Sequence, residues 1–391
     1  MSRFKKDIII INRSFWPIYP VIGEALLQFA EKAANECRVG VILQDHAGIR
    51  EKLEEAQRGK GVDFFPCKAL TNSSSGIFMR MVDAVFFMLW VIGVLLWQRP
   101  KKVYVSTDPP ILVPFIVMLY ARLFGARFVY HLQDVHPEAA NVVIELNSLL
   151  YSALRKLDCV TMRRADQLIT ITEEMAEEIR WRSGTQSPLN VLANPAVSFD
   201  TVDFSGQKKP GFSFCGNAGR LQRIPLVMKS ISKYLDDGGT LEFVFAGSGV
   251  FSNELKALSE RYPEVTYLGL VTPLEAAQLN TVYDWALLPI EDEVTRYAFP
   301  SKTSSYVFSG AKILAICGQK TSVAEWVADK KLGVCVEPKV DEIVSIYQAI
   351  ENNQLDETVF DMDRSELKST LGFDSFVQQL YSLMLTEAVV E

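Results

Sequence analysis

Short apolar runs rich in β-branched residues alternate with longer segments of helical period along almost the whole chain. This alternation is typical of parallel sheets whose faces are covered by helices. Strands are predicted at residues 8–12, 39–43, 103–106, 128–132, 168–172 and 190–192 in the first half, and at 212–215, 241–246, 265–268, 285–289, 312–316 and 333–336 in the second. Helices are expected between them, among others over 23–34, 77–97, 111–124, 146–164 and 173–182.

The alternation is interrupted once, by a polar segment with Gly and Pro between residues 194 and 210, which is typical of a linker. A chain of 391 residues is also long for a single hydrophobic core. We therefore predict an α/β fold with two Rossmann-like doubly wound domains that face a central cleft, 1–198 and 199–372. A last helix within 373–391 is expected to pack back on the first domain.

The composition is that of a globular protein, with 49% hydrophobic and 22% charged residues. Its six cysteines lie far apart, without a C-x-x-C pair or a neighbouring His cluster. This spacing argues against a metal site and against a disulfide framework, and it favours a reducing compartment. The first apolar run, residues 8–11, is too short for a signal peptide. We therefore expect a cytoplasmic protein.

Charge is unevenly distributed along the chain. Residues 1–199 carry 23 Lys+Arg against 20 Asp+Glu, a net of +3, and the remainder carries 17 against 27, a net of −10. A positive first half is consistent with an anionic partner such as a membrane surface, although chance variation between two domains gives the same split. Lys and Arg nowhere cluster with aromatic residues on a polar stretch, so no nucleic-acid partner is expected.

A glycine turn opens the second domain, where the strand at 212–215 is followed by Gly216, Asn217, Gly219 and Arg220. Such a turn lets backbone N–H groups approach a phosphate near a helix N-terminus, although many similar turns are only tight connections. Arg220 would add a positive charge, or it would be a solvated residue at a helix start. The spacing is not G-x-G-x-x-G and no ribose-binding acid follows, so a dinucleotide cofactor is not expected.

Two further segments of the second domain point to an anion. A strand ends in Gly247 and Gly249, and Pro300, Ser301 and Lys302 begin a later helix. Pro is favoured in the first turn of a helix, whereas a Lys there opposes the helix dipole. A phosphate beside Lys302 would remove that conflict.

In this order, the three segments resemble the family 4 retaining glycosyltransferases of the GT-B type, in the branch that builds bacterial surface polysaccharides. Residues 300–310 match its P-S-K-x-x-[E/S]-Y-x-x-x-G segment, and residues 127–138 resemble a strand followed by D-L-W-P-E. Within the latter, Asp134, Pro137 and Glu138 match, and His136 replaces an aromatic residue. The turn at 106–110, an Ala-Asp pair at 165–166 and Asn-Pro at 194–195 also fit, so that the resemblance spans residues 8–385.

The resemblance implies a nucleotide diphosphate sugar as donor, with a UDP-sugar favoured, no cofactor, no metal, and a lipid-linked or growing saccharide as acceptor. Arg220 and Lys302 would stabilise charge on the leaving diphosphate. Asp134 or Glu138 would orient the acceptor hydroxyl or the donor sugar, or would only cap the following helix. His131 is expected to be an ordinary strand residue. The implied donor-binding residues are Gly23, Gly216, Asn217, Gly219, Gly247, Gly249, Pro300, Ser301 and Ser305.

One departure from the family pattern keeps two alternatives open. Many members carry two glutamates seven residues apart in the donor site, whereas this chain has Tyr297 and Ser305. A serine hydroxyl still donates or accepts a hydrogen bond. A GT-B sugar-nucleotide epimerase and a non-catalytic nucleotide-sugar-binding protein remain alternatives to the transferase.

An unbroken apolar run of 14 residues, 84–97, contains Trp90 and Trp97 and is followed by Arg99, Lys101 and Lys102. Spanning a bilayer takes about 20 residues, so a run of this length favours a core or interfacial helix. The tryptophans and the basic flank indicate peripheral contact with the inner face of the cell membrane. The alternative is a helix wholly buried under the first sheet.

Overall fold

The computed structural model describes residues 4–71, 77–360 and 363–385, and the predicted last segment extends beyond these, to residue 391. The chain divides into two compact units. Unit 1 comprises the residues up to Asn194 together with those from Phe373 onward, and unit 2 comprises Pro195–Gly372.

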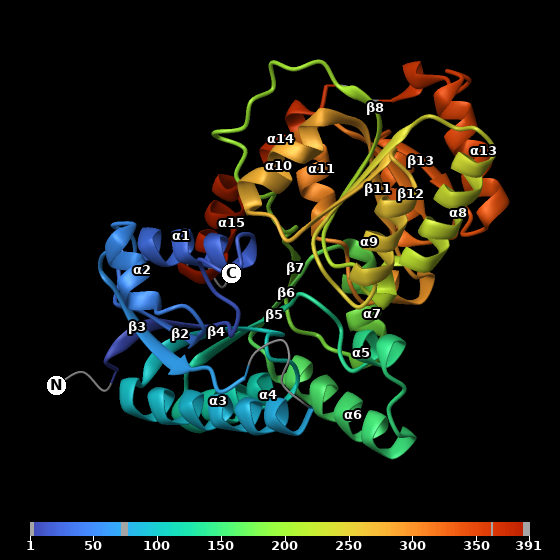
Figure 1. The fold of residues 1–391 in the computed structure, drawn as a ribbon. Coiled ribbons are helices and arrows are strands. Elements are labelled where there is room, and N and C mark those ends of the chain that lie inside the picture. Colours follow the sequence, from blue (N-terminus) through green and yellow to red (C-terminus); the bar gives the residue numbers. More distant parts are fainter. Residues whose placement is uncertain (1–3, 72–76, 361–362, 386–391) are drawn as a thin grey trace. The chain divides into compact units, whose positions relative to one another are not determined.

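Unit 1 contains a seven-stranded sheet in the order β3-β2-β1-β4-β5-β6-β7, in which the pairs are parallel (Figure 1). Its strands are β1 (Lys6–Ile11), β2 (Val39–Asp45), β3 (Val62–Lys68), β4 (Pro100–Ser106), β5 (Arg127–Leu132), β6 (Gln167–Thr170) and β7 (Leu189–Val191). Its helices are α1 (Ile22–Ala34), α2 (Ile49–Glu55), α3 (Ile77–Gln98), α4 (Leu112–Phe124), α5 (Glu138–Val143), α6 (Ser148–Arg164), α7 (Glu173–Ser183) and α15 (Phe373–Leu385).

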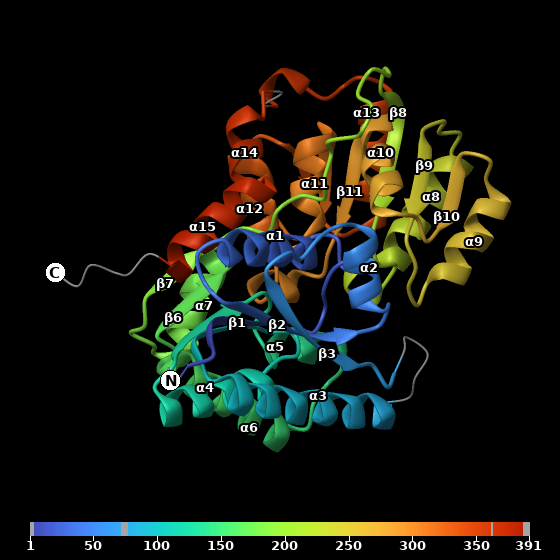
Figure 2. The ribbon, with the colours of Figure 1, turned by 90° about the vertical axis from the view of Figure 1, so that its left-hand side faces the viewer.

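Helices cover both faces of this sheet. On one face α1 packs against α15, and Phe376 and Leu380 of α15 join the same buried cluster as Ile8 and Ile10 of β1. On the other face α3 and α4 lie side by side below the strands, with α6 beyond α4 (Figures 1 and 2). The run of isoleucines in β1 is buried because a parallel strand covered on both faces presents no side to water.

Unit 2 contains a six-stranded parallel sheet in the order β10-β9-β8-β11-β12-β13. Its strands are β8 (Lys209–Cys215), β9 (Glu242–Ala246), β10 (Val265–Gly269), β11 (Tyr283–Pro289), β12 (Lys312–Ile316) and β13 (Gly333–Val336). Its helices are α8 (Ile224–Asp236), α9 (Ser252–Arg261), α10 (Pro273–Val282), α11 (Lys302–Ser309), α12 (Ser322–Asp329), α13 (Val340–Glu351) and α14 (Ser365–Thr370), with short 3₁₀ turns η1 (Arg220–Gln222), η2 (Asp292–Arg296) and η3 (Glu357–Val359). Stacked Phe212 and Phe243 pack with Tyr347 in its core.

The prediction of two Rossmann-like domains is confirmed, since both sheets have the doubly wound strand order. The predicted strands correspond to β1, β2 and β4–β13, with ends that differ by a few residues. Strand β3 was missed. Its sequence VDFFPCK contains a proline and shows little alternation, a pattern tolerated at the edge of a sheet, which is where β3 lies.

In each sheet the strand order reverses between two neighbouring strands. These are β1 and β4 in unit 1, and β8 and β11 in unit 2. Ligands of doubly wound folds bind outside the carboxyl ends of the strands at such a switch point. A ligand site is therefore expected at the loops after these four strands.

Candidate active site

In unit 2, glycines join the loops after β8 and β9. The Gly216 amide donates to the Ala246 carbonyl at 2.9 Å, and the Ala218 amide donates to the Ser248 carbonyl at 3.0 Å. A Cβ on Gly247 would lie 1.9 Å from the Gly216 oxygen, and one on Gly249 would lie 2.3 Å from the Ala218 oxygen. Only glycine permits this backbone contact, so the two predicted glycine segments are two loops packed against each other.

The side chain of Lys302 lies against the glycine loop that follows β8. Its Nζ is 3.8 Å from the centroid of the Phe214 ring, and a Cβ on Gly216 would lie 3.1 Å from the same Nζ. The Nζ is buried and has no hydrogen-bond partner among the residues that the structure describes. Burial lowers the pKa of Lys302 to about 7, because the charged form loses its hydration.

A buried cation of this kind is stabilised by an anion placed beside it. Lys302 is the first residue of α11, with Ser301 as its N-cap, so the helix dipole also favours an anion there. Ser305 lies buried one turn further along α11. The geometry therefore suits a phosphate next to Gly216 and Lys302.

The other predicted residues of this region lie close by but differ in exposure. Asn217 and Arg220 are exposed. Gly219 is buried, and a Cβ on it would lie 2.7 Å from Nδ2 of the Asn217 side chain. The turn does not lead directly into a helix as expected, because η1 and Arg223, with a φ of 45°, come before α8. Arg220 thus starts a 3₁₀ turn and does not stand at the N-terminus of α8.

Arg223 was not singled out from the sequence. Its guanidinium donates to the Ile290 carbonyl at 2.7 Å and to Asp292 at 2.9 Å, and it pairs with Glu291 at 3.1 Å. Asp292 also accepts a hydrogen bond from the Gly318 amide at 2.8 Å. Arg223 therefore ties the loop after β8 to the loop after β11, the two sides of the switch point.

In unit 1, Asp108 fixes the loops at the switch point between β1 and β4. Its carboxylate accepts hydrogen bonds from the Ser14 amide at 2.7 Å and from Arg13 Nε at 3.1 Å. Sequence reasoning quoted the turn at 106–110 but gave Asp108 no role. The signal was its position directly after a strand that borders the switch point.

Asp134 follows β5. Its backbone amide donates to Thr107 Oγ1 at 3.3 Å. Burial raises the pKa of Asp134 to about 6, and the negative charge of Asp108 adds to this shift. Burial lowers the pKa of His136 to about 4, assisted by the positive charge of Arg182. Near pH 7 the loop thus holds a carboxylate and a neutral imidazole.

Glu138 lies in a buried ion-pair network. Its carboxylate contacts Arg182, whose guanidinium also pairs with Asp158, and it lies 3.0 Å from Arg155 Nε. Arg182 in turn donates to the His136 carbonyl at 3.0 Å. These contacts hold the loop after β5 in place, whereas direct contact of Glu138 with a substrate stays a prediction.

Gly23 and His131 have local roles in unit 1. A Cβ on Gly23 would lie 2.6 Å from the Trp16 amide nitrogen, so this glycine lets α1 pack against the loop after β1. His131 is buried, contacts the Tyr104 hydroxyl at 2.6 Å and stacks on Phe376. Burial lowers the pKa of His131 to about 3, and its surroundings are those expected of an ordinary strand residue.

The sequence of unit 1 has known relatives. Residues 22–195 match the family model of the glycosyl transferase 4-like domain. The chain is also 23% identical to the Probable glycosyltransferase WbjE of Pseudomonas aeruginosa over 284 residues, which are 68% of this chain and 70% of that protein.

Solved structures share the fold of the entire chain. HepE (Alr3699) of Anabaena in complex with UDP has a TM-score of 0.65 at 14% identity, covering 97% of this chain and 100% of that one. Its complex with UDP-glucose gives 0.66 at 14% identity, with 98% and 100% coverage. WaaG, a glycosyltransferase involved in lipopolysaccharide biosynthesis, gives 0.67 at 12% identity, with 97% and 100% coverage. The fold is therefore that of GT-B glycosyltransferases.

Proposed function

We propose that this protein transfers a sugar, with retention of anomeric configuration, from a nucleotide diphosphate sugar to a lipid-linked or growing saccharide in surface polysaccharide biosynthesis. The observation that carries the proposal is the buried ammonium of Lys302 beside the Gly216 turn, which has no hydrogen-bond partner among the described residues. A UDP-sugar is favoured as donor, since HepE binds UDP and UDP-glucose in the same fold.

In this proposal the donor diphosphate lies next to Lys302. Negative charge develops on the diphosphate as the bond to the sugar breaks, and a fixed ammonium in a dry site stabilises that charge. Arg220 is exposed at the start of η1, from where its flexible side chain would reach the same anion. Catalysis by leaving-group stabilisation requires no metal, so activity is expected to persist in a chelator.

Asp134 is the residue of unit 1 proposed to act on the acceptor. The half-buried carboxylate of Asp134 has a raised pKa, so it is a stronger base than an ordinary aspartate, and it would accept a hydrogen bond from the acceptor hydroxyl. Neutral His136 is two residues away in the sequence. Glu138 and Arg182 would position this loop through their ion pair.

An assay with several nucleotide sugars tests the proposal. The purified protein is incubated with each donor, with and without lipid-linked saccharide, in the presence and absence of EDTA. The proposal expects UDP release and a glycosylated acceptor. An isomerised donor without UDP release would identify an epimerase, and binding without any reaction would identify a nucleotide-sugar-binding protein.

The proposed location is the cytoplasmic face of the membrane, with α3 as the contact. The segment Met81–Gln98 is long and apolar enough to cross a bilayer, and a third of it is buried. That part, with Phe87, Val91 and Leu95 fully buried, packs on the sheet, so lipid cannot surround the helix. The other side exposes large apolar residues, namely Met81, Val82, Val85, Phe86, Leu89, Trp90, Leu96 and Trp97. One apolar face over a packed face is the arrangement of an interfacial helix.

The basic flank of α3 differs from the sequence-based expectation. Lys101 pairs with Asp7 at 2.8 Å, and Lys102 donates to the Met384 carbonyl at 2.8 Å. Arg99 is exposed and has no ion-pair partner in the described part of the chain. Arg99 is therefore the flanking cation best placed to contact an anionic headgroup.

A further inference from the structure

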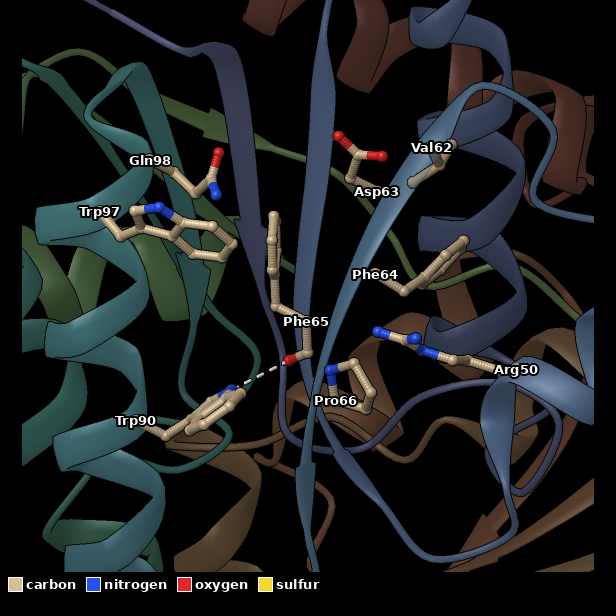
Figure 3. A pocket seen from close by; sticks show the side chains of 9 residues that line it. All are labelled: Arg50, Val62, Asp63, Phe64, Phe65, Pro66, Trp90, Trp97 and Gln98. Atoms are coloured by element: carbon tan, nitrogen blue, oxygen red, sulfur yellow. Dashed lines mark hydrogen bonds between the residues drawn. The ribbon is translucent and has the colours of Figure 1, made fainter.

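A groove follows the edge of the unit 1 sheet. It has a volume of about 660 Å³ and lies along β3, and we call it the edge groove. It is lined by Arg50, Val62, Asp63, Phe64, Phe65, Pro66, Trp90, Trp97 and Gln98. Figure 3 shows Trp97 and Val62 at one end, and Trp90, Pro66 and Arg50 at the other.

The walls of the groove are apolar and its edge is closed to a further strand. Trp90 Nε1 donates to the Phe65 carbonyl at 3.1 Å, and the ring of Phe65 packs edge-on against Trp97. A peptide that extended the sheet would need free backbone groups along β3. The indole occupies the Phe65 carbonyl, which an added strand would otherwise use. The groove therefore suits an apolar ligand and not an added strand.

The charges at the groove are unequal. Asp63 pairs with Lys6, whereas Arg50 is exposed and has no ion-pair partner among the described residues. Arg50 is the second residue of α2, which follows the carboxyl end of β2. In a parallel sheet all strands have their carboxyl ends at the same end of the sheet. Arg50 therefore lies at the end of the sheet from which Asp108 and Asp134 extend. An anionic group at Arg50 would thus face the side that carries the candidate active site of unit 1.

The groove is continuous with the exposed face of α3. Trp90 and Trp97 belong to both, and they are exposed by 40% and 60%. A hydrocarbon chain that leaves a bilayer in contact with α3 would therefore enter the groove without crossing water. A water takes about 30 Å³ in the liquid, and a methylene group is of similar size. The groove, with about 660 Å³, therefore holds roughly 20 methylene groups, enough for one hydrocarbon chain.

We infer that the edge groove binds the lipid of the acceptor, a single hydrocarbon chain joined to a phosphate. The phosphate contacts Arg50, and the chain lies along β3 between Trp90 and Trp97. This inference rests on the proposed lipid-linked acceptor. It adds the place where the lipid is held and the orientation of its headgroup.

Calorimetric titration of the full chain with dodecyl phosphate, below its critical micelle concentration, tests the inference. The wild type is expected to bind one equivalent, and dodecyl maltoside, which has the same chain without the charge, is expected to bind at least tenfold more weakly. Arg50→Glu and Phe65→Gln should each weaken binding of dodecyl phosphate at least tenfold, through loss of the cation and of the apolar wall. Arg50 is exposed, so its replacement leaves the core intact.

Two control variants match these changes. Lys229→Glu makes the same charge reversal on an exposed residue of unit 2, and Leu89→Gln makes an apolar-to-polar change on α3 outside the groove lining. Both should bind dodecyl phosphate within twofold of the wild type. Equal losses in the controls, or no binding by the wild type, would overturn the inference. Full competition by millimolar inorganic phosphate would also overturn it, since the site would then recognise the headgroup alone.

The titration contains no nucleotide sugar, so the two proposals fail separately. Binding of dodecyl phosphate without UDP release from any donor would support the lipid site in the edge groove and contradict the proposed transferase activity. Sugar transfer without binding of dodecyl phosphate would support the transferase activity and contradict the lipid site in the edge groove.

Discussion

At the scale of single residues, the candidate donor site is defined by a cation whose burial costs stability. The folded-state pKa of Lys302, about 7, lies below its ordinary value of 10.5. The unfolded chain therefore binds more protons than the folded one between these values, and the stability of the fold rises with pH across this range. Below about pH 7 the cost is fully present. An anion that binds the ammonium would offset it.

This cost gives a prediction for two replacements of Lys302. Lys302→Met should raise the melting temperature of the ligand-free protein at pH 7, and the gain should shrink as the pH approaches 10. Lys302→Ala should lower the transfer rate by roughly two to three powers of ten, as expected for one charge-stabilising group. UDP should raise the melting temperature of the wild type but of neither variant.

Lys256→Ala is the matched control, because Lys256 is an exposed lysine of the same unit. Its stability and turnover should equal those of the wild type. Wild-type turnover in Lys302→Ala, with intact UDP binding, would remove Lys302 from the site.

Asp134 gives a pH-dependence prediction. Its pKa is raised to about 6, so the carboxylate that would accept the acceptor proton is lost as the pH falls through about 6. The value of kcat/KM should therefore decline below that pH. Asp134→Asn should lower kcat/KM by about 10²–10⁴ and abolish this acid limb. The control Asp329→Asn changes an exposed aspartate of unit 2 and should retain the wild-type profile. An unaltered acid limb in Asp134→Asn would assign the titration to another group.

At the scale of elements, α3 and β3 give unit 1 an apolar surface that the sheet does not cover. Leu89 and Leu96 lie on the exposed face of α3, 57% and 46% exposed, while residues of the same helix are fully buried against the strands. The element is thus neither a core helix nor a free span. The edge groove lies beside it because β3 ends the sheet and leaves its far side to α3.

The membrane role of α3 predicts the behaviour of the protein with vesicles. The wild type should float with anionic vesicles at low salt, and Leu89→Gln with Leu96→Gln should keep it at the bottom of the gradient. Arg99→Glu should weaken binding severalfold, since a cation near an anionic surface contributes about 1 kcal/mol. Salt should reduce binding but not abolish it, because the apolar face supplies most of the affinity.

Leu268→Gln with Leu270→Gln changes two exposed leucines of unit 2 and serves as the matched control. This variant should float like the wild type. If the wild type itself stays at the bottom with anionic vesicles at low salt, α3 does not contact lipid.

At the scale of the whole molecule, the chain leaves unit 1 at Asn194, builds unit 2 and returns to unit 1 at Phe373. The returning helix α15 completes the first core. Phe376 is buried and stacks on His131, and Leu380 is fully buried in the same cluster as β1. The stability of unit 1 therefore depends on residues nearly 180 positions away from the rest of it in the sequence.

This dependence predicts a local effect of Phe376→Ala. Removal of a buried phenylalanine should cost about 3–5 kcal/mol of unfolding free energy. Hydrogen exchange should accelerate in β1, β4, β5 and α1, and should stay unchanged in β8–β13. Gln379→Ala alters an exposed residue of the same helix and should stay within about 0.5 kcal/mol of the wild type. Faster exchange across both units would show instead that they unfold together.

The two Rossmann-like domains and most of their strands could be predicted from the sequence alone. Buried parallel strands must be apolar along their whole length, so runs such as that of β1 are visible without a structure. The glycine turns and Lys302 were also found in this way, because backbone contact and an unfavourable charge at a helix start leave signs in the sequence.

The contacts of each side chain, in contrast, became visible only in the folded structure. It placed Glu138 in an ion pair with Arg182, which lies 44 residues further along the chain, and it held Lys102 on the Met384 carbonyl. It identified Asp108 and Arg223 as the residues that fix the switch-point loops, and it revealed β3 and the edge groove. These features depend on residues brought together from distant parts of the chain, and local periodicity carries no information about such partners.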